Sequence, residues 1–187
     1  MEIDQLIFKR LHNFYKKITT KVDEEIEGRT VFLEPLKPRL TILSRALTGY
    51  QNEIITSERE GGWSGLKFYL PQSISFADSV EKNINYYIFR VLYLSVQQKM
   101  RLNWENNEEQ KTSVSQIEAN SYSKKVLDEL FDEYPTTKEI YNELITSLES
   151  HYQTLNKPCD YSWIYGRAMR QNPHEFNVKT KNPLVIV

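Results

Sequence analysis

Residues 61–96 constrain the possible folds of this chain more than any other segment. The glycine-rich stretch 61–65 leads into a short aromatic strand that ends at Pro71, and an almost uninterrupted apolar run follows from Ile84 to Val96. A helix that is apolar on nearly every side has no face suited to water. We therefore expect a folded domain in which a helix over about 78–102 is central and buried.

Hydrophobic periodicity predicts helices on both sides of this segment. Apolar residues three or four positions apart form one stripe from Ile3 to Val22, and a second stripe runs from Ile140 to Tyr152. This spacing is typical of amphipathic helices. The expected helices cover residues 3–22, in an element that ends at Gly28, and residues 39–47, 78–102, 115–133, 136–155 and 160–169.

Helix end signals support these boundaries. Asp78, Ser115 and Thr136 are each followed three residues later by a glutamate, which is the pattern of a capping box. Asp160 is suited to cap the last short helix, and Gly49 follows the helix over 39–47. The sequence thus predicts where most helices begin and where the second one ends.

Two short strands are expected between the second helix and the central one. Residues 53–56 and 66–70 have strand composition, and the glycine-rich loop between them suggests a hairpin over about 53–70. Pro38 favours an extended conformation for the residue before it, so we expect residues 36–38 to be extended. The predicted fold class is mainly α, with about six helices around the central helix and one small β-hairpin.

One domain is expected to include residues 1–172. Beyond it the chain is basic and irregular, Pro173 and Pro183 interrupt any regular element, and the last residues, Leu184 to Val187, are apolar. Four apolar residues in a row favour burial against a sheet edge or a partner. We interpret 173–187 as a tail that would link the helical domain to a C-terminal domain outside this sequence.

Composition excludes several classes of protein. The net charge is −1, so bulk electrostatics favour neither nucleic acid nor a membrane surface. The single cysteine, Cys159, excludes an internal disulfide framework and suits a reducing compartment. Charges at Glu2 and Asp4 do not fit a signal peptide, and the longest apolar stretch is interrupted by Arg90 and too short to cross a bilayer. We expect a cytoplasmic protein with no transmembrane segment.

No catalytic, cofactor or metal site is predicted. His12, His151 and His174 lie far apart in the sequence and could form a zinc site only by a coincidence of folding. Cys159 has no nearby base in the sequence, so a passive thiol is the preferred interpretation. The carboxylate pairs 24–25 and 108–109 fit solvated helix faces better than an acid–base pair.

Two short motifs resemble ligand-binding loops without completing them. The glycines of 61–65 lack the lysine and hydroxyl of a phosphate-binding loop, which favours a hairpin turn. Asp160 and Ser162 begin like the metal loop of von Willebrand A domains, but Ile164 stands where a ligand is required. A helix cap is therefore the better interpretation of Asp160.

The surface charges suggest protein partners more than nucleic acid. The basic stretch from Lys9 to Lys21 could contact nucleic acid, but acidic residues follow at once and end the basic field. A basic group near the C-terminus and an acidic group on the helices before it would together form a surface with separate positive and negative patches. Such a surface steers the association of protein partners. An ordinary solvated surface is the alternative. The basic group comprises Arg167, Arg170, Lys179 and Lys181, and the acidic group Glu129, Asp132, Glu133, Glu139 and Glu143.

Three functional classes remain open on the residues alone. The first is a protein-interaction domain, because no catalytic constellation is visible. The second is a small enzyme whose site assembles from scattered residues such as His12, Tyr86, Arg90 and Tyr93. The third is a nucleic-acid-binding helical domain that uses the stretch from Lys9 to Lys21.

Residues 38–100 resemble the N-terminal region of NorD-type proteins, the nitric oxide reductase activation proteins that carry a C-terminal von Willebrand A domain. The resemblance covers about a third of the chain and follows a pattern of helix, weak strand pair, Leu-Pro stop and long helix. The residues that carry it are Arg39-Leu40, Arg45 to Gly49, Leu70-Pro71, Phe76, Asn83 or Asn85, Tyr87 and Gln97 or Gln98. After that glutamine, Lys99 to Arg101 replace the small residues and histidine of many family members, so no histidine ligand is implied here.

The resemblance implies an accessory role in denitrification. Members of the family work beside a MoxR-type AAA+ ATPase, and the pair is thought to remodel or metallate the membrane-bound nitric oxide reductase. In this system the A domain binds the divalent ion and the ATPase hydrolyses ATP. A front domain alone would then be a non-catalytic helical adaptor for the ATPase or for the reductase, with no cofactor of its own.

Overall fold

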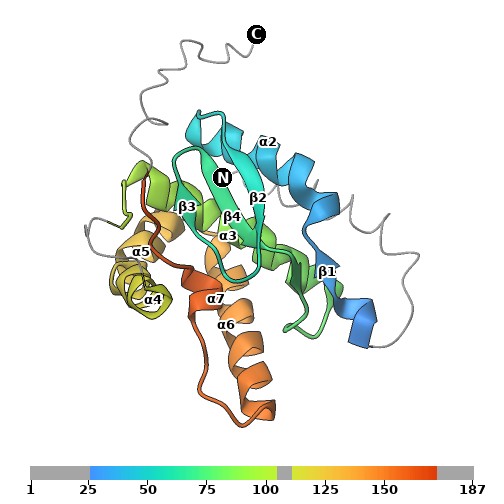
Figure 1. The fold of residues 1–187 in the computed structure, drawn as a ribbon. Coiled ribbons are helices and arrows are strands. Elements are labelled where there is room, and N and C mark those ends of the chain that lie inside the picture. The colour runs from blue at the N-terminus through green and yellow to red at the C-terminus, as the bar shows by residue number, and fades with distance from the viewer. Residues whose placement is uncertain (1–25, 105–110, 172–187) are drawn as a thin grey trace.

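The computed structural model describes residues 26–104 and 111–171. Within these ranges the chain forms six α-helices and two small sheets (Figure 1). The helices are α2 (Lys37–Thr48), α3 (Val80–Lys99), α4 (Thr112–Ser121), α5 (Ser123–Glu133), α6 (Thr137–Thr154) and α7 (Ser162–Tyr165). The strands are β1 (Val31–Phe32), β2 (Glu53–Ser57), β3 (Trp63–Ser64), β4 (Lys67–Pro71) and β5 (Ser73–Ile74). The helix expected over 3–22 and the tail 173–187 lie outside the described residues.

The mainly α fold class and the central helix are confirmed. Every residue of α3 from Tyr86 to Gln98 is buried. α3 contacts α2 and β4, and it also contacts α5, α6 and α7, so it lies between the sheet and the helices that follow it (Figure 1). The helix ends at Lys99 rather than at 102, because Arg101 adopts a left-handed backbone conformation with φ of 55°.

The start of α3 differs by one residue from the prediction. Ser79, not Asp78, is the N-cap, and its hydroxyl accepts a hydrogen bond from the backbone N–H of Lys82 at 3.2 Å. Asp78 instead forms an ion pair with the Lys82 ammonium at 3.0 Å. Both residues are good capping types, so the sequence located this helix start only to within one position.

The predicted hairpin over 53–70 is wrong in its strand direction. β2 and β4 are adjacent but parallel, and β4 pairs antiparallel with the additional strand β3 on its other edge. The reason lies in the loop between the strands. The Gly61 carbonyl accepts from Arg167 N–H and the Gly62 carbonyl accepts from Tyr69 N–H, so the loop crosses to the far edge of β4 before the chain turns.

The second sheet joins β1 and β5 in antiparallel fashion. Val31 lies opposite Ile74 and Phe32 opposite Ser73, and Leu33 N–H donates to the Gln72 carbonyl at 2.9 Å. Val31 and Ile74 point into the core, whereas Phe32 and Ser73 are exposed. This small sheet therefore has one buried face and one solvated face.

The extended segment expected at 36–38 is helical instead. Residues Glu34–Leu36 form a 3-10 turn, and α2 begins at Lys37 with Pro38 in its first turn. Proline is tolerated there because the first N–H groups of a helix have no partner within the helix. The predicted stop is confirmed, since Gly49 adopts φ of 73° and its N–H donates to the Arg45 carbonyl.

The single helix expected over 115–133 is two helices. α4 begins at Thr112, three residues before the predicted cap, and α5 starts after Tyr122. Ser115 is buried inside α4, where its hydroxyl donates to the Thr112 carbonyl. The serine–glutamate spacing at this position thus falls within a helix and does not mark its start.

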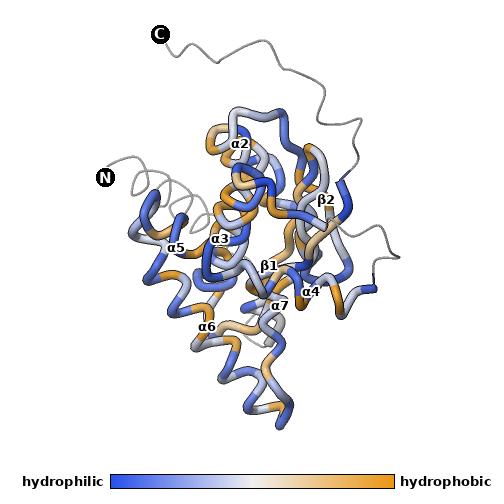
Figure 2. The backbone as a smooth tube through the Cα atoms, turned by 90° about the vertical axis from the view of Figure 1, so that its left-hand side faces the viewer, coloured by the Kyte–Doolittle hydropathy of each residue, from blue (hydrophilic) through white to orange (hydrophobic). Residues whose placement is uncertain are grey.

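The last two predicted helices are present. α6 follows Thr136 as expected, although the Thr136 side chain does not form the capping hydrogen bond. Leu144 and Leu148 of the predicted stripe are buried, and bands of hydrophobic and hydrophilic residues alternate along α6 (Figure 2). α7 is shorter than predicted, because Gly166 ends it after Tyr165 with φ of 73°.

Candidate functional site

The main candidate site is a pair of adjoining hollows between α6 and the chain around β5. The first, here named the aromatic hollow, has a volume of about 180 Å³. β5 and the residues after it line one side, α6 lines another, and α7 contributes Trp163. Besides Ser73 and Ser75, its lining residues are Ile74, Phe76, Leu148, His151, Tyr152 and Trp163.

The second hollow is larger and more polar. This polar hollow has a volume of about 480 Å³ and shares Phe76 and His151 with the aromatic hollow. Hydroxyl and amide side chains of α6 line one side together with Glu143, and charged side chains from the segments before and at the start of α3 line the other. The charged residues at its wall are Arg29, Asp78, Lys82 and Glu143.

Hydrogen bonds fix the aromatic walls of the first hollow. Trp163 Nε1 donates to the Tyr152 hydroxyl at 3.2 Å, which joins α7 to α6. The Trp163 carbonyl accepts from the hydroxyl of Tyr86 at 2.9 Å, and Phe76 packs edge-on against the Tyr86 ring with centroids 5.6 Å apart. The hollow therefore has a preformed shape set by contacts to the central helix.

Asn83 positions the loop between β5 and α3. Its side-chain oxygen accepts from Ala77 N–H at 3.1 Å, and its side-chain nitrogen donates to the carbonyls of Arg29 (2.8 Å) and Ala77 (3.2 Å). The asparagine itself is fully buried. One side chain thus holds both the loop that carries Phe76 and the backbone of Arg29 at the edge of the polar hollow.

The charges of the polar hollow nearly balance. The Lys82 ammonium forms its ion pair with Asp78, and this hydrogen bond raises the pKa of Lys82, with a smaller contribution from Glu143. All three groups lie at the surface, where ion pairs contribute little to stability. With two basic and two acidic side chains, the lining of the hollow favours neither an anionic nor a cationic ligand.

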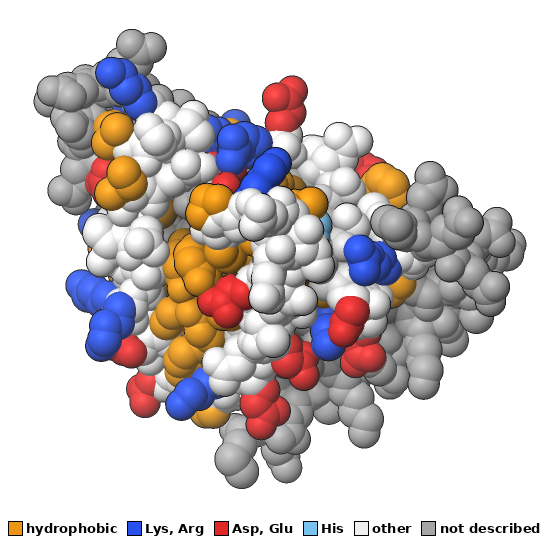
Figure 3. Space-filling model, turned by 90° about the horizontal axis from the view of Figure 1, so that it is seen from below, with side chains coloured by type: hydrophobic (Ala, Val, Ile, Leu, Met, Phe, Trp, Pro, Cys, Tyr) orange, Lys and Arg blue, Asp and Glu red, His pale blue; other side chains and the backbone are white. Residues whose placement is uncertain are grey.

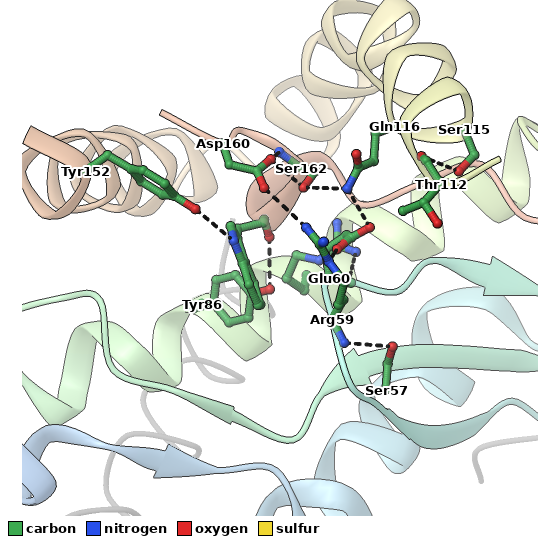
Figure 4. A network of polar contacts seen from close by, with 12 residues as sticks. Ser57, Arg59, Glu60, Tyr86, Thr112, Ser115, Gln116, Tyr152, Asp160 and Ser162 are labelled. Carbon is green, nitrogen blue, oxygen red and sulfur yellow. Dashed lines mark hydrogen bonds and ion pairs between the residues drawn. The ribbon is translucent and has the colours of Figure 1, made fainter. Parts of the chain in front are cut away.

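A second cluster of polar residues lies where α7, α4 and the loop after β2 meet (Figure 4). Glu60 is fully buried, and its carboxylate accepts from Arg59 Nε at 3.1 Å and from Gln116 Nε2 at 2.9 Å. Asp160 accepts hydrogen bonds from both the backbone N–H and the hydroxyl of Ser162. Asp160 thus satisfies the first backbone N–H of α7, but Tyr161 and not Asp160 occupies the N-cap position, so the predicted cap is one residue early.

Arg90 anchors this cluster to the central helix. Its guanidinium donates to the carbonyls of Ile164 at 2.7 Å and Glu60 at 3.2 Å, and Arg90 is fully buried. A Cβ added at Gly166 would lie 2.5 Å from Arg90 Nη2, which explains the glycine there. The cluster joins α3, α7 and the loop after β2. We therefore interpret it as a structural cluster that holds these three segments together.

Of the residues proposed for a scattered enzyme site, the three that the structure describes line neither hollow. Tyr86, Arg90 and Tyr93 are fully buried in the core and have no accessible surface. Burial raises the pKa of both tyrosines above the ordinary value, which opposes their use as bases or nucleophiles near neutral pH. Arg90 does lie close to both tyrosines, with its guanidinium carbon 5.9 Å from the centroid of the Tyr93 ring and its charge acting on Tyr86, but the three meet inside the core. His12 lies outside the described residues.

The remaining sequence candidates fall in separate places. His151 lines both hollows, whereas His174 and the carboxylate pairs 24–25 and 108–109 lie outside the described residues. Cys159 is half-buried, and burial together with nearby Glu149 raises the pKa of its thiol, which opposes formation of a thiolate. Across residues 26–104 and 111–171, no group of three His, Cys, Asp or Glu side chains is placed to hold a metal ion.

The space beside the glycine-rich loop is occupied by the backbone of neighbouring chain segments. A Cβ at Gly61 would lie 2.1 Å from the Tyr69 carbonyl oxygen, and one at Gly62 would lie 2.3 Å from that of Arg167. Two chain segments therefore approach too closely for a phosphate to bind between them. Gly65, with φ of 57°, supplies the tight turn between β3 and β4.

Several of the residues that carry the NorD resemblance form hydrogen bonds that connect α2, the two sheets and α3. The side chains of Asn52 and Gln98 exchange two hydrogen bonds at 3.0 and 3.1 Å, and Gln98 also donates to the Gly65 carbonyl. The Tyr87 hydroxyl donates to Pro71 and Val31 carbonyls. Arg45 donates to the Asn52 carbonyl, so this set links α2, both sheets and α3.

Sequence reasoning missed the hollows themselves. The lining of the aromatic hollow comes from three separate segments, 73–76, 148–152 and 163, and the polar hollow adds Arg29, Asp78, Lys82 and further residues of α6. None of these segments carries a ligand-binding motif. The nearest signal was Trp163, an aromatic residue directly after a helix cap, together with Tyr152 at the end of an amphipathic stripe. These residues mark a helix packing surface equally well.

Comparison with family models, with curated proteins and with solved structures gave no match. Among the helices that the structure describes, none has the length and hydropathy needed to cross a bilayer. The nucleic-acid alternative rests on residues 9–21, which lie outside the described ranges.

Proposed function

We propose that this chain is a non-catalytic protein-interaction domain of a NorD-like accessory protein. In this role it acts in the cytoplasm as an adaptor for a MoxR-type AAA+ ATPase and for the nitric oxide reductase that the pair activates or metallates. The observation that carries the proposal is the connection among the resembling residues. Arg45, Tyr87 and Gln98 come from separate parts of the pattern and hold one structural unit together.

The buried polar residues support a role without chemistry. Glu60, Arg90 and Asn83 each use their side-chain groups to hold backbone or neighbouring side chains inside the fold. Catalytic groups need access to a substrate and a pKa matched to their task. Burial raises the pKa of the core tyrosines Tyr86 and Tyr93, which lack that access.

The surface supports a role in binding. Hydrophobic side chains form a strip on the face seen from below, and acidic and basic side chains border it (Figure 3). On α5 and α6, the acidic residues named in the sequence analysis are all exposed, and Glu133 also pairs with Lys99 at 2.6 Å. Apolar contact area bordered by charges is the usual composition of a protein interface.

A pull-down experiment with the purified ATPase and the detergent-solubilised reductase tests this proposal. We expect at least one of the two to be retained by the wild-type protein. Retention should fall in a variant with Glu129→Lys, Asp132→Lys and Glu139→Lys, because these exposed charges steer association. Glu58→Lys, an exposed residue in the loop after β2, is the control. No retention of either partner by the folded wild-type protein would refute the proposal.

A further inference from the structure

The small β1–β5 sheet has an open edge. The Gln72 carbonyl accepts a hydrogen bond from Leu33 N–H and so points toward β1. In a trans peptide the C=O and the following N–H point in opposite directions, so the Ser73 N–H points away from β1. Ile74 faces Val31 across the pair, which directs the Ser73 carbonyl to the same outer side. In the described part of the chain, this sheet has only two strands.

The aromatic hollow lies alongside this open edge. Ser73, Ile74 and Ser75 form one of its walls, and Trp163 and Tyr152 form part of the opposite side. Its volume of about 180 Å³ compares with the roughly 150 Å³ of a protein cavity that admits a benzene ring. One aromatic side chain therefore fits, and the rings of the lining favour edge-on or offset contacts with it.

We propose that the outer edge of β5 and the aromatic hollow together bind an extended segment of a partner protein, with one aromatic side chain of that segment in the hollow. Outward-pointing N–H and C=O groups of one strand match the backbone of another extended chain, which identifies the ligand as a peptide. The adjoining polar hollow, lined by Asn142, Ser147 and Ser150, accepts the polar residues that follow the aromatic one. This inference rests on the proposed function and specifies its binding mode.

The probe is a seven-residue peptide, acetylated and amidated, with a central Phe flanked by alternating Thr and Val. In the NMR spectrum of the full-length protein, we expect the peptide to shift the signals of residues 73–76, His151 and the Trp163 indole. It should also slow exchange of the Ser73 amide proton. Replacing the central Phe of the peptide by Ala should weaken binding at least tenfold, because the hollow then stays unfilled.

Ser73 provides a matched pair of variants. Ser73→Pro removes the outward N–H together with the exposed hydroxyl, and proline is tolerated on an edge strand when its nitrogen faces away from the neighbouring strand. The loss of one hydrogen bond should weaken peptide binding about fivefold. Ser73→Ala keeps the N–H and removes the exposed hydroxyl, so its affinity for the peptide should equal that of the wild type.

Several results would overturn the inference. These are an absence of shifts at 73–76 with millimolar peptide, unchanged exchange of the Ser73 amide in the bound state, and equal affinity of Ser73→Pro and the wild type. If the same shifts appear when the protein concentration is raised without peptide, the edge binds a second copy of this chain instead.

If Ser73→Pro retains the ATPase and the reductase as the wild type does, the binding mode fails and the proposed function stands. If the peptide binds and neither protein does, the proposed function fails and the peptide site stands.

Discussion

Replacement of Leu92 by alanine measures how far the fold depends on α3. Leu92 is 2% exposed in the middle of this helix. The substitution removes three carbon atoms, each worth about 0.8 kcal/mol of transfer free energy, and the cavity left behind adds a further cost. We expect the free energy of unfolding to fall by about 3–4 kcal/mol, which corresponds to a decrease of about 10 °C in the melting temperature for a chain of this length.

Urea unfolding followed by far-UV circular dichroism provides the measurement, with the slope of the transition compared between variants to confirm two-state behaviour. Ile42→Ala is the control, because Ile42 lies on the outer face of α2 and is 67% exposed. This control should lose less than about 0.5 kcal/mol. A loss of similar size for Leu92→Ala would show that α3 is peripheral and that the reasoning from its hydrophobicity is wrong.

Three other perturbations test particular contacts. Asn83→Ala leaves the Ala77 N–H and two carbonyls without their partner and should cost about 1–3 kcal/mol in urea unfolding; a loss within error of zero would contradict the role of Asn83. Gly49→Ala should cost about 1–2 kcal/mol from its left-handed backbone alone, and Gly166→Ala should cost more because its Cβ also meets Arg90; equal losses would contradict the close approach. Stability should fall as pH rises above about 10, because unfolded tyrosines then lose protons that the buried ones retain, and a flat profile would contradict their burial. Burial raises the pKa of Tyr86, Tyr93, Tyr122 and Tyr165.

The sequence predicted correctly those elements that are buried because of the number and spacing of their apolar residues. The run from Ile84 to Val96 could only be a central helix, because no face of it suits water. Leu144 and Leu148 marked the buried side of α6 by their spacing. These features follow from the hydrophobic effect, which acts residue by residue and can be read from a single sequence.

Strand direction and the exact helix starts depend on contacts between distant residues. The crossing that makes β2 and β4 parallel depends on the close approach of Gly62 to Arg167, more than 100 positions later. Strand composition carries no information about direction, so a hairpin was the natural expectation. In the same way, Asp78 and Ser79 are both suitable caps, and tertiary contacts decide between them.

The hollows could not be predicted for a related reason. Ser73, His151 and Trp163 are unremarkable in their local sequences, and only the fold brings them together. The buried network of Arg90 and Glu60 was also not foreseen as a structural cluster, although Arg90 stood out inside an apolar run. A lone charge within such a run indicates a buried hydrogen-bonding role as well as a catalytic one.

The central claim is that this domain binds the proteins of a reductase activation system. The most direct test is sedimentation velocity of the full chain mixed with the purified MoxR-type ATPase, and separately with the reductase in detergent. We predict a faster boundary that contains the chain together with at least one of the two proteins and that saturates as the partner is added. Independent sedimentation of the folded chain in both mixtures, at concentrations up to about 100 µM, would contradict the account, since even weak specific complexes form in that range.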